Sequence, residues 1–165
     1  MLFRSVPHHG QLAVLEAVGP VQFTSIRAFA ARGIDQTFTV LRPQSPLTAE
    51  QQAAMVKVAQ AWLRPPVAYD KRFLWNDNEL YCSELVWKLY QRALHIELVP
   101  LARFRSFRLD DPKVRRLIEA RFPRGQLPLD EPVVAPSGLL ASPHLRNLGE
   151  FRLPTGGANG SAPRR

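Results

Sequence analysis

The sequence predicts an α+β fold, and three observations carry this prediction. Short stretches in the first third of the chain alternate apolar and polar residues as strands do. Two later stretches, residues 48–63 and 82–94, instead repeat apolar residues at helical spacing. The composition of the 165-residue chain, 45% hydrophobic and 22% charged, is ordinary for one soluble domain with its own core.

Three short strands are expected in the first part of the chain. Residues 11–18, QLAVLEAV, alternate well enough for a strand, and Glu16 has apolar neighbours whichever face is buried. A Gly-Pro turn then allows residues 21–26 to pair back as a second strand. Residues 36–43 form the third strand, which ends at a proline.

Capping residues mark the starts of two helices. Ser25 is expected to cap a short helix, with Gly33 as the residue that follows its last turn. Thr48 and Gln51 form a capping-box pair at the start of the clearest helix. The apolar face of that helix is expected to contain Val56, Ala59 and Leu63.

The second half of the chain combines helices with long loops. Residues 67–80 are aromatic and irregular, and the helix that contains the cysteine follows them. Asp111 can cap a helix over residues 113–122. Residues 127–143 are interrupted by prolines and are expected to form a loop that wraps a surface.

The boundaries and the charge are also informative. We expect one domain over residues 1–153 and a disordered, low-complexity tail over residues 154–165. The net charge of +8 comes from 22 Lys and Arg against 14 Asp and Glu, and it fits either solvated surface positions or an acidic partner. A single cysteine excludes an internal disulfide and a multi-cysteine zinc site.

No targeting or spanning segment is visible. No run approaches the roughly 18 apolar residues of a transmembrane helix, and the first residues lack the apolar segment of a signal peptide. The chain as written is therefore expected to be neither exported nor membrane-spanning.

Cys82, the only cysteine, permits two interpretations. On a helix it shares a face with Leu85 and Leu89, and free cysteine is among the most buried residue types, so it can belong to the core. Alternatively, Asn76 to Asn78 are natural capping residues, which places Cys82 in the first turn. There, unpaired N–H groups and the helix dipole stabilise a thiolate and can donate to an oxyanion. Composition and spacing leave both interpretations open.

Three segments together resemble one family. They are GQLAVLEAVGPV (residues 10–21), PPVAYDKRFLWNDNELYCSELVWKLY (residues 65–90) and PLDEPVVAPSGLLASP (residues 128–143). In this order they resemble the YiiX/YaeF-like cysteine hydrolases, circularly permuted papain-fold relatives of the NlpC-type cell-wall amidases. The middle segment, with YCSELVWK, is the most specific. The resemblance implies a permuted papain-like (NlpC-type) fold, a small antiparallel sheet packed against helices.

The resemblance also implies roles for individual residues. Cys82 matches the nucleophile, and Glu16 matches the acidic residue that orients the catalytic histidine, although it could instead be an edge-strand carboxylate in water. Tyr69 resembles the tyrosine on the oxyanion side, with plain packing as the alternative; Tyr81 and Ser83, beside the cysteine, are further candidates for contact with the oxyanion or substrate. The implied reaction is cleavage of an amide or ester through a Cys acyl-enzyme, without a metal or an organic cofactor. The implied substrate is a cell-wall peptide or an acylated amine or lipid.

One departure from the family pattern concerns the histidine. The family carries it on the strand before the one with Glu16, which extrapolates here to a position near Leu2, where there is none. His8 and His9 stand in a predicted hairpin turn, some distance from a mid-strand partner, and His95 and His144 are expected at the surface. We therefore expect an N-terminally truncated copy, in which a strand, the histidine and any export signal are missing. A periplasmic or cell-envelope location is expected only if the intact protein carries such a signal.

Two other interpretations compete with an active enzyme. One is a non-catalytic module whose basic C-terminal third docks on an anionic polymer or membrane surface; nucleic acid is not favoured, because no aromatic residues interleave with the bases in a recognisable motif. The other is a fragment that keeps the fold without turnover. The basic residues of the C-terminal third that would form the docking surface include Arg103, Arg105, Arg108, Lys113, Arg115 and Arg116.

Overall fold

The computed structural model describes residues 5–8, 11–122 and 126–152, with side chains from Ala13 onward. Helices and small, mostly antiparallel sheets are mixed along the chain, so the predicted α+β class is confirmed. The tail predicted over residues 154–165 lies outside the described residues and stays a prediction.

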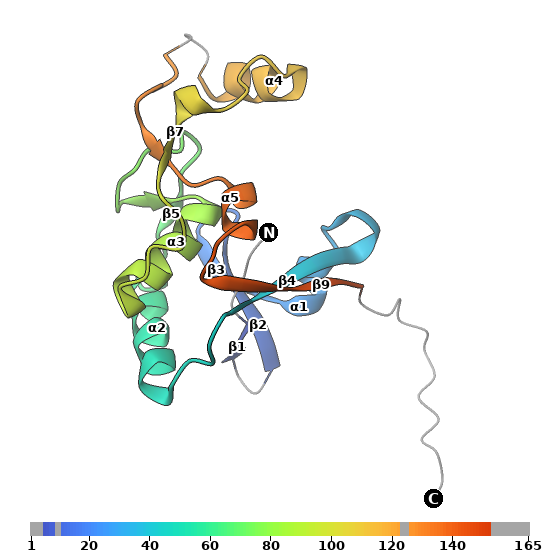
Figure 1. Cartoon of the computed structure of the whole chain (residues 1–165), viewed down its shortest axis with the longest axis vertical. Coiled ribbons are helices and arrows are strands. Elements are labelled where there is room, and N and C mark those ends of the chain that lie inside the picture. The colour runs from blue at the N-terminus through green and yellow to red at the C-terminus, as the bar shows by residue number, and fades with distance from the viewer. Residues whose placement is uncertain (1–4, 9–10, 123–125, 153–165) are drawn as a thin grey trace, which may run out of the picture.

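A three-stranded antiparallel sheet lies at the centre, in the order β1-β2-β3 (Figure 1). Its strands are β1 (Ser5–His8), β2 (Gln11–Ala17) and β3 (Val21–Ser25). From Ala13 to Ala17 every residue of β2 is buried, so this strand is covered on both faces. Glu16 therefore lies in the interior, among the apolar neighbours that the sequence pattern predicted.

The helix after this sheet begins as predicted but ends differently. Ser25 Oγ accepts a hydrogen bond from the N–H of Ala28 (3.2 Å) and starts α1 (Ile26–Ala30). Gly33 is not a left-handed capping residue, because its φ is −74°. A Cβ at Gly33 would lie 2.3 Å from the carbonyl oxygen of Thr37, so close backbone approach explains the glycine. A short 3₁₀ turn, Ile34–Gln36, leads onward.

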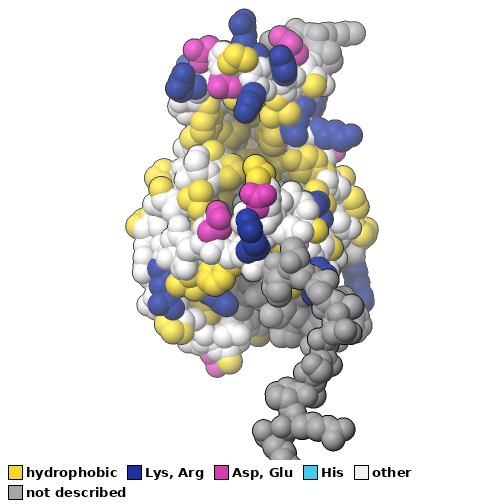
Figure 2. Space-filling view, turned by 90° about the vertical axis from the view of Figure 1, so that its right-hand side faces the viewer, with side chains coloured by type: hydrophobic (Ala, Val, Ile, Leu, Met, Phe, Trp, Pro, Cys, Tyr) yellow, Lys and Arg dark blue, Asp and Glu magenta, His cyan; other side chains and the backbone are white. Residues whose placement is uncertain are grey.

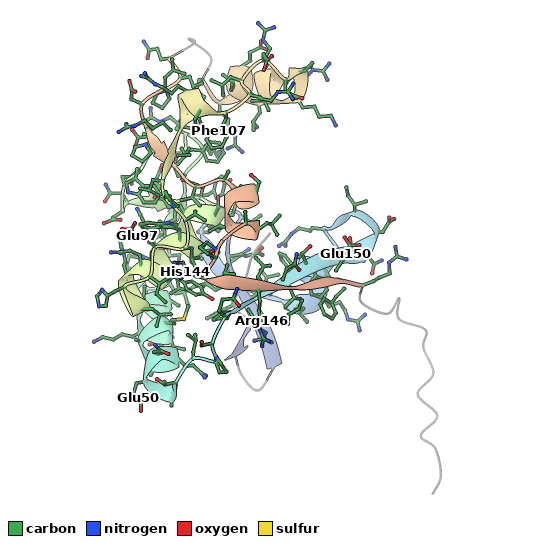
Figure 3. The ribbon with its side chains drawn as sticks, in the orientation of Figure 1. Glu50, Glu97, Phe107, His144, Arg146 and Glu150 are labelled. Carbon is green, nitrogen blue, oxygen red and sulfur yellow. The ribbon has the colours of Figure 1, made fainter. Side chains whose placement is uncertain are left out.

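A two-stranded antiparallel ribbon joins the first and last thirds of the chain. It consists of β4 (Thr37–Pro43) and β9 (Leu145–Arg152), and it projects to the right in Figure 1. The sequence predicted β4 but not β9, whose residues are almost all exposed and show little apolar alternation. Figure 3 shows Arg146 and Glu150 on β9.

Two long helices pack against each other beside the sheet. They are α2 (Ala49–Ala61), which begins with the predicted capping box, and α3 (Cys82–Leu94), which also contacts β2. The predicted buried face of α2 was partly wrong, because Val56 is 37% exposed. Ala59 is buried as predicted, and Met55 and Trp62 are buried beside it.

Short elements complete the fold. Parallel strands β5 (Ala68–Tyr69) and β6 (Glu79–Leu80) bracket the aromatic segment. The later elements are β7 (Ala102–Arg103), a 3₁₀ turn (Phe104–Ser106), α4 (Pro112–Arg121), β8 (Pro132–Val133) and α5 (Pro136–Leu140).

The last predicted loop contributes more to the interior than expected. Within residues 127–143, which the sequence suggested as a surface wrap, Val133, Val134, Leu139 and Ser142 are buried. The helix α4, by contrast, has no buried residue, and Figure 2 shows Lys and Arg side chains gathered around it at the top of the molecule. No helix in the described part of the chain has the length and apolar character needed to cross a membrane.

Candidate active site

Cys82 is the first residue of α3, and its side chain is half-buried. The residue that caps the helix is Tyr81, with extended backbone (φ −97°, ψ 167°), and not Asn76 to Asn78 as the sequence suggested. The carboxylate of Glu84 accepts a hydrogen bond from the backbone N–H of Tyr81 (3.2 Å), which fixes the helix start. Because the first N–H groups of a helix have no partner within it, the thiol stands beside donors.

The residues on either side of Cys82 hold a distant strand in place. The hydroxyl of Ser83 donates to the carbonyl of Val134 (2.7 Å), and the N–H of Val134 donates to the hydroxyl of Tyr81 (3.0 Å). Tyr81 is 2% exposed and Ser83 5%. Both candidates for substrate contact thus use their hydroxyls to bind the backbone after β8, which locks the position of Cys82 between them.

Tyr69 stands next to the nucleophile through strand pairing. Tyr69 of β5 is paired with Leu80 of β6, and Leu80 precedes the helix cap directly. Burial raises the pKa of the half-buried Tyr69 hydroxyl, negative charge on Cys82 raises it further, and the guanidinium of Arg121 opposes the rise. The hydroxyl therefore stays protonated and can donate a hydrogen bond near the sulfur.

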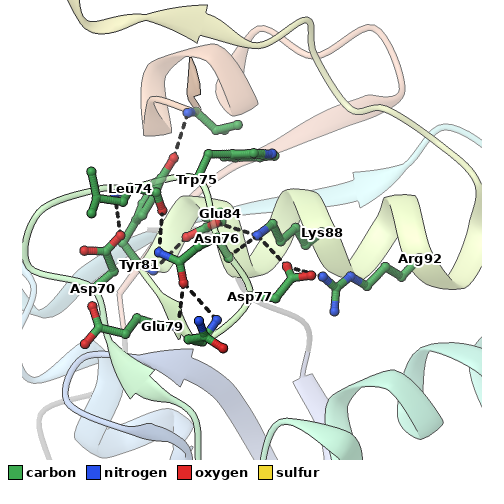
Figure 4. A network of polar contacts seen from close by, with 12 residues as sticks. Asp70, Leu74, Trp75, Asn76, Asp77, Glu79, Tyr81, Glu84, Lys88 and Arg92 are labelled. Atoms are coloured by element: carbon green, nitrogen blue, oxygen red, sulfur yellow. Dashed lines mark hydrogen bonds and ion pairs between the residues drawn. The ribbon is translucent and has the colours of Figure 1, made fainter. Parts of the chain in front are cut away.

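Asp70 organises the loop that leads to the helix. It is fully buried, and its carboxylate accepts hydrogen bonds from the backbone N–H groups of Arg72 (2.7 Å) and Leu74 (2.5 Å). Its own N–H donates to the carbonyl of Leu80 (3.2 Å). The carboxylate of Asp70 thus orders the aromatic loop (Figure 4), and its backbone N–H ties that loop to β6, which leads into α3.

A buried lysine fastens the other side of this loop to α3. Lys88 Nζ lies 2.7 Å from Glu84 Oε1, 2.8 Å from Asp77 Oδ1 and 4.7 Å from the centre of the Trp75 ring (Figure 4). It also donates to the carbonyl of Asn76. Burial raises the pKa of Glu84 to about 7, although Lys88 opposes this. These contacts hold the aromatic loop against the first turns of α3.

Glu16 has partners other than a histidine among the described residues. It is 1% exposed, which excludes the alternative of a solvated edge carboxylate. Arg32 Nη2 donates to both of its oxygens (2.6 and 2.5 Å), and the hydroxyl of Thr24 donates to Oε1 (2.5 Å). The expectation that a buried carboxylate needs a partner is met, but by a guanidinium and a hydroxyl instead of an imidazole.

The backbone register places His8 far from Glu16. His8 is paired with Gln11 at the opposite end of β2. At about 3.3 Å per residue, this separates their backbones by roughly 17 Å along the strand. His9 lies outside the described residues. The histidines whose side chains are described, His95 and His144, are both exposed, as predicted; Figure 3 labels His144.

Sequence reasoning missed most of the residues that support the site. Arg32, Val134 and Arg121 reach it from far along the chain, and no local pattern marks them. Glu84 and Lys88 carry a weak signal, since they are spaced i,i+4 on a helix.

A cavity of about 740 Å³ lies apart from Cys82, between α2, α3 and the β4–β9 ribbon. Neither Cys82 nor Tyr69 lines it, whereas Leu85, Val86 and Leu89 of α3 do. Within the residues that the structure describes, no group of three or more His, Cys, Asp or Glu could hold a metal ion.

Comparison with known proteins agrees with this geometry. Residues 2–149 match a family described as permuted papain-like amidase enzymes, YaeF/YiiX, C92 family. The chain is 36% identical over 135 residues to the uncharacterized protein YiiX of Escherichia coli K12, over 82% of this chain and 65% of that protein's length. The crystal structure of YiiX from E. coli O157:H7, described as a metalloprotein, is similar with a TM-score of 0.83 and 32% identity. That similarity covers 92% of this chain and 82% of the other.

Proposed function

The chain belongs to the permuted papain-like amidase family, and on that premise we propose that it is a cysteine hydrolase whose nucleophile is Cys82. The observation that carries the proposal is the place of Cys82. It is a half-buried thiol at the first position of α3, with the Tyr69 strand paired beside it. A thiol at a helix start is activated by the dipole and by nearby donors.

The proposed reaction is acyl transfer from an amide or an ester. A base takes the thiol proton, and Cys82 Sγ attacks the carbonyl carbon of the substrate. The hydroxyl of Tyr69 and backbone N–H groups at the start of α3 donate to the oxyanion. The C–N or C–O bond then breaks as the leaving group takes the proton, and water hydrolyses the thioester.

The base is proposed to be an imidazole held by Glu16. Family resemblance implies this pairing, and the burial of the carboxylate supports it. A histidine beside Glu16 would share that carboxylate with Arg32, which already occupies both oxygens. The proposed substrates remain a cell-wall peptide or an acylated amine or lipid.

The first experiment measures the rate of Cys82 alkylation by iodoacetamide from pH 4 to pH 10. A thiolate paired with an imidazolium stays reactive well below the ~8.5 pKa of a free thiol. Glu16→Gln should weaken this reactivity at low pH, Cys82→Ser should abolish labelling, and His9→Ala shows whether that histidine is the partner. Reactivity that rises only near the free-thiol pKa would instead support a fragment that keeps the fold without turnover.

The basic C-terminal third supports a second proposal, contact with an anionic surface. On α4, Lys113, Arg115 and Arg116 are all exposed, and none forms an ion pair among the described residues. Sedimentation with anionic lipid vesicles tests this: binding should fall with added salt and be unchanged in Cys82→Ala. Binding that ignores salt would contradict it.

A further inference from the structure

The structure assigns a carboxylate-binding role to Arg121: we propose that its guanidinium, at the end of α4, recognises a carboxylate of the substrate beside the bond that Cys82 attacks. This inference rests on the proposed function and names one feature of its substrate. Four observations about the described residues support it.

The first observation is the position of the guanidinium. The Cζ atom of Arg121 lies 4.3 Å from the centre of the Phe73 ring. The same ring meets the ring of Tyr81 edge-on, with centres 5.1 Å apart. Because Tyr81 caps the helix that begins with Cys82, one aromatic ring separates the guanidinium from the residue before the nucleophile.

The second observation is that the Phe73 ring, on which the guanidinium lies, is held in a fixed position. Phe73 has a left-handed backbone (φ 55°), which is uncommon for a residue that is not glycine and persists only where its surroundings fix it. Asp70 supplies that support by accepting from the N–H groups on both sides of Phe73, those of Arg72 and Leu74. The ring that carries Arg121 is thus held in one place.

A chain of aromatic contacts also connects α4 to the site. The ring of Phe122, directly after Arg121, meets that of Phe104 at 6.4 Å, and Phe104 meets Phe73 at 6.2 Å. Although α4 buries none of its own residues, Phe122 anchors its last turn beside the candidate nucleophile.

The third observation is the lack of a charge partner. Among the described residues, Arg121 donates a long hydrogen bond to the carbonyl of Lys71 (3.4 Å) and interacts with the hydroxyl of Tyr69, but no carboxylate lies within ion-pair distance of it. Other arginines near carboxylates, such as Arg32 and Arg92, are paired. A half-buried guanidinium that lies on an aromatic ring and has no carboxylate partner keeps N–H donors available for a planar anion.

The fourth observation links Arg121 with Tyr69 and Cys82. The guanidinium of Arg121 and the charge of Cys82 act in opposite directions on the pKa of the Tyr69 hydroxyl, so the three groups share one neighbourhood. A substrate carboxylate that binds Arg121 would therefore be held in the neighbourhood of the Tyr69 hydroxyl and the sulfur. Guanidinium favours carboxylate here because its paired N–H groups match the two oxygens.

The test compares two alkylating reagents of nearly equal size, iodoacetate and iodoacetamide. In both, Cys82 Sγ forms a bond to the CH₂ carbon while the C–I bond breaks and iodide leaves. Only iodoacetate carries the carboxylate. The ratio of the two rate constants, normalised to that of free glutathione, therefore measures anion recognition without any need for turnover.

We expect the normalised ratio to fall about fivefold in Arg121→Gln at low salt. Arg121→Lys should restore part of it, and about 0.5 M NaCl should shrink the difference. Arg27→Gln is the matched control, since it removes an equal charge from an exposed position on another helix, α1. An unchanged ratio in Arg121→Gln, or an equal fall in Arg27→Gln, overturns the inference.

A protection assay supplies a second readout on the unaltered protein. N-acetylalanine should slow alkylation by iodoacetamide more than N-acetylalaninamide does, and Arg121→Gln should remove that difference. Protection by inorganic phosphate equal to that by N-acetylalanine would overturn the assignment to a carboxylate.

The two proposals fail in different ways. Cys82 that reacts only near pH 8.5, yet still prefers iodoacetate through Arg121, contradicts the activated nucleophile but supports the anion site. If Cys82 is reactive at low pH but shows no preference that depends on Arg121, the activated nucleophile is supported and the anion site is contradicted. No reaction with either reagent at pH 9 contradicts both, because an accessible thiol is ionised there.

Discussion

At the scale of single residues, the site depends on groups whose surroundings restrict what they can do. Tyr69 is kept protonated by burial and by the neighbouring sulfur. Glu84 is placed where burial favours its neutral form, although it neighbours Lys88. Tyr69 gives a prediction about stabilisation of the oxyanion, and Glu84 gives one about how the stability of the fold depends on pH.

Replacing Tyr69 by Phe should weaken the inhibition of Cys82 by a peptide aldehyde about tenfold, because the tetrahedral adduct loses one donor. The iodoacetamide rate should change little, since alkylation builds no oxyanion. Tyr90→Phe, which removes a hydroxyl near the other end of α3, is the matched control. Equal loss in both assays would indicate that Tyr69 only packs.

Glu84 should make the protein less stable as the pH rises. Its pKa is about 7 in the folded chain against 4.5 for an ordinary glutamate, so between these values the unfolded chain loses its proton first. This lowers the free energy of unfolding by up to about 3 kcal/mol from pH 4.5 to pH 7, with no further loss above that range. Urea unfolding of Glu84→Gln should show a flatter pH profile.

Glu97→Gln serves as the control for this profile, because Glu97 is exposed (Figure 3). Asp77 affects stability in a different pH range. Lys88 lowers the pKa of Asp77, so the contribution of Asp77 to folding stability is present above the ordinary pKa of 3.8 and is lost as the pH falls through the lowered pKa. A profile in Glu84→Gln that matches the unaltered protein would show that Glu84 is ionised in the fold.

At the scale of elements, the start of α3 is defined by what holds it from outside. Ser83 donates to the carbonyl of Val134 and Ser106 to that of Arg103, both at 2.7 Å, but only the first bond is buried. Ser83→Ala should therefore cost about 1–3 kcal/mol of unfolding free energy, because a buried carbonyl loses its donor. Ser106→Ala should stay within about 0.5 kcal/mol. Thermal and urea unfolding of the two variants compare the bonds directly, and equal costs would refute the role of burial.

Local chemistry made several elements predictable. The capping box of Thr48 and Gln51, the cap at Ser25 and the Asp111-Pro112 helix start are all encoded within a few residues, and the structure contains each of them. The cysteine helix was placed correctly, but its cap was not, since Tyr81 has no side-chain preference for capping. The helix start is held by the hydrogen bonds of Tyr81 and Ser83 to the backbone of Val134, and no local sequence pattern reveals these bonds.

Some residues of the candidate site were likewise predictable from the sequence, and others were not. Cys82, Tyr69 and Glu16 lie in motifs that resemble a known family, and the structure makes Glu16 buried and Tyr69 a neighbour of the helix start. Arg32 and Arg121 were not predictable, because an arginine in an arginine-rich chain carries no signal until the fold brings it to a carboxylate or a ring. Contacts between distant segments decide these roles.

At the scale of the whole molecule, the β4–β9 ribbon joins the first third of the chain to its last described strand. Phe38 of β4 stacks on Phe151 of β9 with centres 6.2 Å apart, and Leu145 joins the core at 8% exposure. The ribbon also forms one wall of the 740 Å³ cavity. The fold is therefore complete only when its last strand is in place.

Ending the chain after residue 144 should lower the melting temperature by at least about 5 °C and promote aggregation, because β4 loses its partner and presents an open edge. Ending it after residue 153 removes only the predicted tail and should leave the melting temperature unchanged. Calorimetry with size-exclusion chromatography distinguishes the two. A stable, monomeric chain of 144 residues would show that the ribbon is dispensable.

The pairing of β4 with β9 also sets an order of events during synthesis. Residues 37–43 leave the ribosome long before residues 145–152, and at about 5–20 residues per second the interval lasts many seconds. Throughout that time the nascent chain carries an unpaired strand that cannot find its partner locally, the kind of distant contact that slows folding. The final residues of the described chain therefore complete a pairing that cannot form earlier in synthesis.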